Sequence, residues 1–230
     1  MIKKIDMKTI ITSILVILVY FAWPYFINTV LNSFSVNYNF KILLMFLSNF
    51  LLLIAIAFIY NESLKKDYKD FKRNHHKYMG KCFKIFIVGL VLFVLVNVLI
   101  SVIFDIFNIN YNNLLRLNEV YLNEPILLII LNFIYYPIIE ELVFKKTLKE
   151  ILKNKWVFII LSGLINACFI RLFFFQNKFD LIYIIPEAIL LISFSYMYYK
   201  FDNIIVPIIY RMIYAILPSV VILLNVLELI

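Results

Sequence analysis

Histidine and cysteine, the residues that most often build metal and redox sites, are scarce in this sequence. Two of each occur among 230 residues, and neither a CxxC nor an HExxH motif is present. Cys82 falls at the edge of one apolar segment and Cys168 inside another, which argues against a structural disulfide. His75 and His76 are adjacent in a basic stretch. These features exclude a disulfide-stapled fold and the common motif-based zinc sites.

Glycine is scarce as well, with three residues in the whole chain. Few clusters of proline, glycine or serine interrupt the sequence, and no segment repeats at a fixed period. Transporters commonly show internal repeats and glycine-interrupted helices at the binding site. Their absence from the sequence argues against transport, and the lack of linkers favours one domain over residues 1–230.

Charge is the third scarcity, and it excludes a soluble protein. Only 16% of the residues are charged, whereas 64% are hydrophobic. A soluble domain is closer to half apolar, so the excess must face lipid. The ten-residue alternation of a membrane barrel is not seen, and the backbone polar groups of a lipid-exposed chain must be satisfied internally. We therefore expect an all-α, polytopic membrane helical bundle.

Apolar runs long enough to cross a hydrocarbon core of roughly 30 Å define the expected helices. They lie at about residues 9–31, 42–60, 85–108, 126–144, 156–176, 181–199 and 203–217. The chain after residue 217 either extends the last helix, bent at Pro218, or forms a short eighth segment. The sequence thus predicts seven or eight transmembrane helices.

The positive charges predict the orientation. When the segments alternate across the membrane, 17 of the 22 basic residues fall on one side, and only Lys41, Arg116 and Lys178 fall on the other. The positive-inside rule then places the N-terminus in the cytoplasm. Eight of the 17 lie in residues 61–84, which we expect to be a basic cytoplasmic loop contacting anionic lipid headgroups rather than nucleic acid.

Five ionisable residues fall inside the apolar segments, where a charge is costly and marks a candidate functional site. They are Glu140, Glu141, Arg171, Glu187 and Arg211. At a rise of about 1.5 Å per residue, Glu140 lies about 8 Å from the cytoplasmic end of its segment and Arg211 about 13 Å. Arg171 and Glu187 both fall in the outer half. The simplest pairing is Glu140 or Glu141 with Arg211, and Glu187 with Arg171.

The two adjacent glutamates are expected to have different partners. Neighbouring helical residues point about 100° apart, and Glu141 stands one turn before Lys145 in the favourable order for an ion pair. We therefore predict a local pair between Glu141 and Lys145, which leaves Glu140 to face the interior of the bundle. Such pairs can be purely structural, without any chemistry.

Three stretches carry a resemblance to a known family. The sequences PIIEELVFKK (137–146), SGLINACFIR (162–171) and YMYYKFDNIIVPIIYRMIYAIL (196–217) appear in the order and spacing of its signatures. Together they resemble the CPBP family of CAAX proteases and bacteriocin-processing enzymes, also called the Abi family. The resemblance implies a CAAX-protease-like core over residues 85–217, preceded by N-terminal helices and the basic loop (1–84) and followed by a C-terminal segment (218–230).

In active members of that family, the first glutamate of the pair is thought to activate a water molecule. Histidines and an asparagine position it, bind metal or stabilise the oxyanion. The resemblance therefore implies Glu140 as the base and Glu141 as its neighbour. The other positions depart from the pattern: Lys145 stands for arginine, Asn166 and Ile170 for phenylalanine and histidine, and Arg211 and Ala215 for histidine and asparagine.

These departures decide between functions. Arginine stays protonated, so Arg211 can neither bind a metal nor shuttle a proton, and we expect no metal or other cofactor. We predict a proteolytically inactive membrane scaffold, regulator or bacteriocin-immunity protein that binds a membrane protein or peptide. The alternative is an active intramembrane endopeptidase with Glu140 as general base and Arg211 as an electrostatic clamp. A transporter with Arg171 and Glu187 lining its path is a third possibility. The composition, rich in Ile, Asn, Lys, Phe and Tyr, is like that of proteins from AT-rich bacterial genomes and suggests a bacterial plasma membrane.

Overall fold

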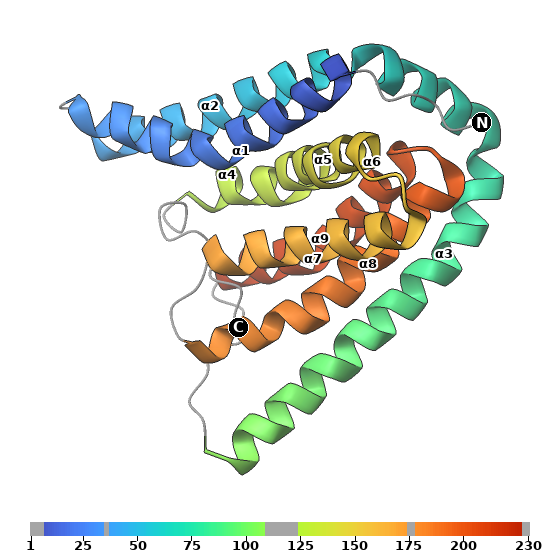
Figure 1. The fold of residues 1–230 in the computed structure, drawn as a ribbon. Coiled ribbons are helices and arrows are strands. Elements are labelled where there is room, and N and C mark those ends of the chain that lie inside the picture. The colour runs from blue at the N-terminus through green and yellow to red at the C-terminus, as the bar shows by residue number, and fades with distance from the viewer. Residues whose placement is uncertain (1–6, 35–36, 109–123, 174–177, 227–230) are drawn as a thin grey trace. The chain divides into compact units, whose positions relative to one another are not determined.

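The computed structural model describes residues 7–34, 37–108, 124–173 and 178–226 of the chain. Within these ranges all regular structure is helical, which confirms the predicted all-α class (Figure 1). Six of the described helices are long and apolar enough to cross a membrane. The helix α7 (Lys155–Phe173) coincides with the predicted fifth segment and is the candidate for a seventh span. Arg116, expected outside the membrane, is not among the described residues.

The predicted basic loop at residues 61–84 is wrong. These residues form the first half of α3 (Asn61–Ile106), a continuous helix of 46 residues. Tyr60 alone separates it from α2 (Tyr38–Ile59). The stretch contains no proline, and lysine is a good helix former, so nothing ends the helix before the apolar part begins. The charge pattern indicates on which side of the membrane the segment lies, but it does not distinguish a helix from a loop.

The predicted alternative of an eighth helix is also wrong for the described residues. The last helix, α9, runs from Ile205 to Val226 with Pro218 inside it. The helix therefore continues through Pro218, and no new helix starts there. A neighbouring helix in a membrane protein can satisfy the carbonyl that proline leaves without its usual donor.

By packing, the chain divides into two compact units, which are described separately. The first comprises Met1–Lys66, Leu117–Ile151 and Arg211–Ile230, and the second comprises Asp67–Arg116 and Leu152–Tyr210. The prediction of a single domain stays a prediction.

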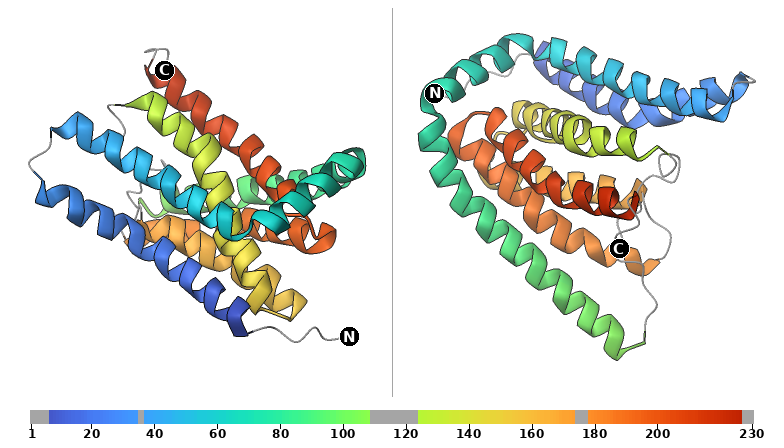
Figure 2. Two further views of the ribbon diagram at one scale, coloured as in Figure 1. Left: turned by 90° about the horizontal axis from the view of Figure 1, so that it is seen from above. Right: turned by 180° about the vertical axis from the view of Figure 1, so that it is seen from behind.

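In the first unit, α1 (Met7–Ser33) and α2 pack against an interrupted central helix. Its consecutive parts are α4 (Pro125–Ile130), η2 (Leu131–Tyr135), α5 (Tyr136–Glu141), η3 (Leu142–Thr147) and α6 (Leu148–Ile151). Helix α1 contacts η3 and α6, and α2 contacts η2 and α5 (Figure 2). Phe144 packs edge-on against Tyr20 at 5.6 Å between ring centroids. The central helix thus lies in the interior of this unit.

In the second unit, the scarce glycines allow helices to approach closely. An added Cβ at Gly163 in α7 would lie 2.7 Å from the backbone nitrogen of Ile192 in α8 (Ile184–Phe201). One at Gly89 in α3 would lie 2.6 Å from the hydroxyl of Ser193 in α8. Two of the chain's three glycines therefore stand at helix crossings, where small residues drive association in a membrane.

Candidate functional site

The glutamate pair lies where the central helix changes its winding. Glu140 and Glu141 end α5, and the next six residues form η3, a π-helical turn. The hydroxyl of Thr147 donates to the carbonyl of Leu142 at 2.9 Å, five residues earlier, within this wider turn. A second π turn, η2, directly precedes α5, which carries Pro137 in its first turn. Single π turns inside helices occur frequently at functional sites.

This part of the chain is buried on all sides. Residues 139–148 form an unbroken run of ten buried residues, although two glutamates, two lysines and a threonine are among them. Glu141 and Lys145 have no exposed surface, and Glu140 retains 4%. Because a buried charge is costly unless it is paired, these side chains need counter-ions inside the protein.

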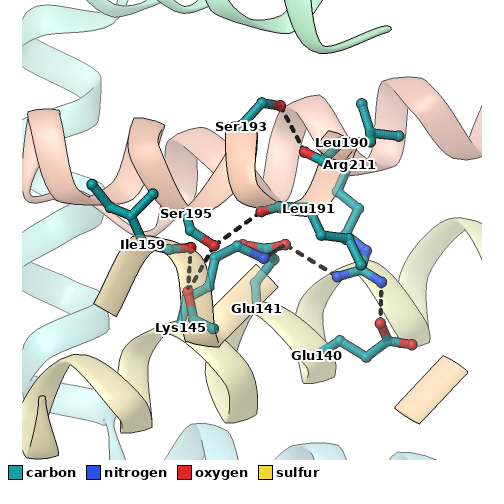
Figure 3. A network of polar contacts seen from close by, with 10 residues as sticks. Glu140, Glu141, Lys145, Ile159, Leu190, Leu191, Ser193, Ser195 and Arg211 are labelled. Carbon is teal, nitrogen blue, oxygen red and sulfur yellow. Dashed lines mark hydrogen bonds and ion pairs between the residues drawn. The ribbon is translucent and has the colours of Figure 1, made fainter. Parts of the chain in front are cut away.

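The counter-ions come from the same helix and from α9 (Figure 3). Nζ of Lys145 lies 2.6 Å from Oε1 of Glu141, which is the predicted local pair. Arg211 of α9 points its guanidinium at both carboxylates: Nη1 lies 3.2 Å from Oε1 of Glu141, and Nη2 bonds Oε2 of Glu140. Glu140, Glu141, Lys145 and Arg211 together form a buried cluster, called here the ion-pair tetrad.

The prediction that the two glutamates do not share a partner is wrong. Their side chains do leave the helix in different directions, but the planar guanidinium has two terminal nitrogens and bridges them. The predicted contact of Arg211 with one glutamate is present, and the second contact was not expected. With two carboxylates and two cations, the tetrad is balanced in charge.

The geometry does not suit a metal ion. A divalent cation held by Glu140 and Glu141 would lie against the positive charges of Lys145 and Arg211, which already bind the carboxylate oxygens. Among the described residues no group of three histidine, cysteine, aspartate or glutamate side chains could act as ligands. His75 and His76 are exposed on α3. The residues present therefore do not fit the metal that the family resemblance raises.

Uncharged partners hold the end of η3 in place. The hydroxyls of Tyr60 and Thr147 lie 2.9 Å apart, and Nζ of Lys146 donates to the hydroxyl of Ser63. Just beyond, the hydroxyl of Ser13 donates to Oε2 of Glu150 at 3.0 Å. A search for charges in apolar segments passes over Tyr60 and Thr147. The sequence feature that could have indicated Thr147 is its place directly after the basic pair Lys145 and Lys146, at the end of a predicted span.

The remaining predicted site residues lie elsewhere in the chain. In the second unit, Nη2 of Arg171 is 3.0 Å from Oε1 of Glu187, as the sequence predicted. The guanidinium carbon of Arg171 also lies 5.4 Å from the centroid of the Tyr183 ring. Asn166 is buried on α7, and Ile170 is half-buried. In the first unit, Ala215 is buried on α9, and its carbonyl accepts a hydrogen bond from the Ser219 hydroxyl at 2.8 Å.

Comparison with known proteins bears on this site. Residues 122–217 match the family model described as type II CAAX prenyl endopeptidase Rce1-like. The matched region contains all three stretches that carried the resemblance, together with every member of the tetrad. No curated protein and no solved structure matches the chain. Residues 122–217 of this multi-span membrane protein are therefore similar to the type II CAAX prenyl endopeptidase Rce1-like family, the family to which the signature stretches had pointed.

Proposed function

We propose that this chain is a non-proteolytic member of its family that binds a membrane protein or a peptide. The observation that carries the proposal is that Arg211 contacts both Glu140 and Glu141. Arg211 stands at the position where the resemblance implies a histidine. The side chain that would have helped to position a water molecule is thus replaced by one that binds the carboxylates themselves.

The chemistry of a general base supports the same conclusion. Such a base must take a proton from the attacking water through one of its oxygens. Oε2 of Glu140 already accepts a bond from a guanidinium that stays protonated at neutral pH, so a water molecule would have to compete with Arg211 for that oxygen. An electrostatic clamp for an oxyanion would need donors aimed at the substrate, whereas both terminal nitrogens of Arg211 are directed at glutamates.

The biological role that we propose is that of a membrane scaffold, a regulator or a bacteriocin-immunity protein. The support comes from the family resemblance, in which such roles occur, and from a tetrad that is complete without substrate. We place the protein in a bacterial plasma membrane with a cytoplasmic N-terminus, on the basis of residue usage and the distribution of lysine and arginine.

The test compares membranes from cells that express the native chain, Glu140→Gln, or the control Glu62→Gln. Glu62 is an exposed glutamate at the start of α3, so its loss leaves the tetrad intact. Mass spectrometry would record both the termini of membrane peptides and the proteins that co-purify with the tagged chain. We expect the same termini in all three samples and a reproducible bound partner. Termini that vanish only with Glu140→Gln would overturn the proposal in favour of an endopeptidase.

A further inference from the structure

The first half of α3 presents a surface that the tetrad does not explain. Its basic residues in the second unit are all exposed: Lys69, Lys72, Arg73, Lys77, Lys81 and Lys84. Against these six, residues 67–84 contain only two acidic side chains, Asp67 and Asp70. The six basic residues are called here the basic face of α3.

The two aspartates are turned away from this face and are occupied. Asp67 is buried: its backbone carbonyl accepts a hydrogen bond from Nδ2 of Asn203 at 2.7 Å, and Oδ2 of its carboxylate accepts one from the backbone N–H of Ile204 at 3.4 Å. The same amide nitrogen lies 2.9 Å from Oδ2 of Asp70, which also accepts the hydroxyl of Tyr78. These hydrogen bonds, with the Tyr78 hydroxyl first, lower the pKa of Asp70. The carboxylates are therefore used in holding α3 to the turn before α9.

The packing of α3 fixes which side the basic residues occupy. Asp67, Phe71, Asn74, Tyr78 and Cys82 recur at intervals of three or four residues and, together with Asp70, form the buried or half-buried stripe of the helix. Such spacing places them on one side of a helix. The rings of Phe71 and Tyr78 stack at 6.3 Å, and Tyr78 meets Phe201 edge-on at 5.4 Å. The basic face occupies the remaining, outward-facing positions.

The basic face continues into a surface that meets lipid. From Ile85 onward α3 is apolar, and Ile87, Val88 and Val91 are exposed as they would be to hydrocarbon. The helix continues without a break from its polar part into its apolar part. Phe83, at the boundary between them, is 56% exposed. The basic face thus borders the membrane-spanning part of the same helix.

Aromatic and basic residues also meet at the adjoining ends of α7 and α8. Nζ of Lys155 lies 4.9 Å from the ring centroid of Trp156 and 5.3 Å from that of Tyr199. Nζ of Lys200 lies 5.5 Å from the ring centroid of Tyr196. Tryptophan, tyrosine and lysine of this kind are typical of the level of the lipid headgroups.

We propose that the basic face of α3 binds the anionic headgroups of phospholipids in the surrounding bilayer. Charge complementarity and continuity with a lipid-facing helix select this partner. Each lysine or arginine near an anionic surface strengthens the attraction, and the effect is screened by salt. Six such residues on one face form a surface that discriminates anionic from zwitterionic lipid. This proposal is independent of the proposed function, because none of its residues belongs to the tetrad.

The experiment uses the purified full chain in mixed micelles, titrated with phosphatidylglycerol or phosphatidylcholine and read by native mass spectrometry. One variant replaces all six residues of the basic face with Gln. The matched control exchanges each lysine for arginine and Arg73 for lysine, which keeps every charge. Gln, Lys and Arg have similar helix propensities, so both variants should retain α3. Thermal unfolding in phosphatidylcholine would verify that they fold equally well.

We expect the native chain and the charge-keeping control to prefer phosphatidylglycerol, and the Gln variant to lose that preference by roughly tenfold or more. Raising the salt concentration should reduce the preference of the native chain. Inorganic phosphate, compared with chloride at equal ionic strength, should not compete. An unchanged preference in the folded Gln variant would overturn the proposal, and competition by phosphate would overturn the assignment to lipid. If the Gln variant does not fold, insensitivity of the native preference to salt would overturn it.

Discussion

Arg211 and Lys145 meet at a single oxygen of Glu141. Nη1 of Arg211 lies 3.2 Å from Oε1, and Nζ of Lys145 lies 2.6 Å from the same atom. Oε2 of Glu141 has no hydrogen-bond donor among the described residues. The second nitrogen of Arg211 is directed to Glu140. One guanidinium from α9 therefore ties together the two carboxylates of the central helix.

Replacing Arg211 with Lys should weaken the tetrad although it keeps the charge. A single ammonium group cannot reproduce the fork that reaches both carboxylates, so at least one charged hydrogen bond is lost. We expect a loss of about 1.5–3 kcal/mol in the free energy of unfolding. Thermal unfolding in lipid micelles would measure it. Arg73→Lys, an exposed exchange on α3, is the control and should stay within about 0.5 kcal/mol of the native chain.

Replacing Gly163 with Ala should separate α7 from α8. The new methyl group would lie 2.7 Å from a backbone nitrogen of Ile192, which cannot move aside as a side-chain end can. We expect a destabilisation of about 1–3 kcal/mol, typical of overpacking. Gly80→Ala provides the contrast, because no atom lies within 4 Å of the new methyl and alanine favours a helix. Equal unfolding temperatures for the two variants would contradict the close crossing.

The pair of Arg171 and Glu187 should be replaceable only as a pair. Both side chains are buried, so Arg171→Met removes the ion-pair partner of a buried carboxylate, at a cost of about 3–5 kcal/mol. Arg171→Met combined with Glu187→Met removes both charges and should recover most of the stability. If the pair lines a transport path instead, the double variant would fold normally and abolish an ion flux. Liposome flux measurements beside unfolding curves separate these outcomes.

Replacing Tyr78 with Phe should make the free energy of unfolding fall less steeply as the pH is lowered. The Tyr78 hydroxyl lowers the pKa of Asp70, so its stabilisation is present above the ordinary carboxyl pKa of about 3.9. It is lost as the pH falls through the lowered pKa. We expect a cost of about 1 kcal/mol at pH 7, because Asp70 is only partly buried and water screens the bond. Tyr68→Phe, which changes an exposed ring of the same helix, should leave the free energy of unfolding unchanged both at pH 7 and in acid. A gap between Tyr78→Phe and the native chain that does not shrink at all as acid protonates Asp70 would exclude this origin.

The sequence predicted most of the elements and both ion pairs between segments, because the cost of charge in lipid leaves few arrangements for Glu140, Arg171, Glu187 and Arg211. It could not predict that Arg211 reaches both glutamates. That contact depends on the rotation of α9 and on the π turn after Glu141, neither of which leaves a periodic signal. The polar half of α3 was missed for another reason: lysine-rich helices and lysine-rich loops satisfy the positive-inside rule equally well.

The most direct test of the tetrad as a structural core is a double-mutant cycle between Arg211 and Glu140. Arg211→Met and Glu140→Met would be made singly and together, and thermal unfolding would be measured in lipid micelles. The double variant keeps the pair of Glu141 with Lys145, which loses only its contact with Arg211. We predict that each single variant is strongly destabilised, by about 3–5 kcal/mol, and that the double variant recovers most of the loss. Catalytic residues are often kept at a cost in stability. A Glu140→Met chain as stable as the native one, or more stable, would therefore contradict the account and indicate a site retained for chemistry.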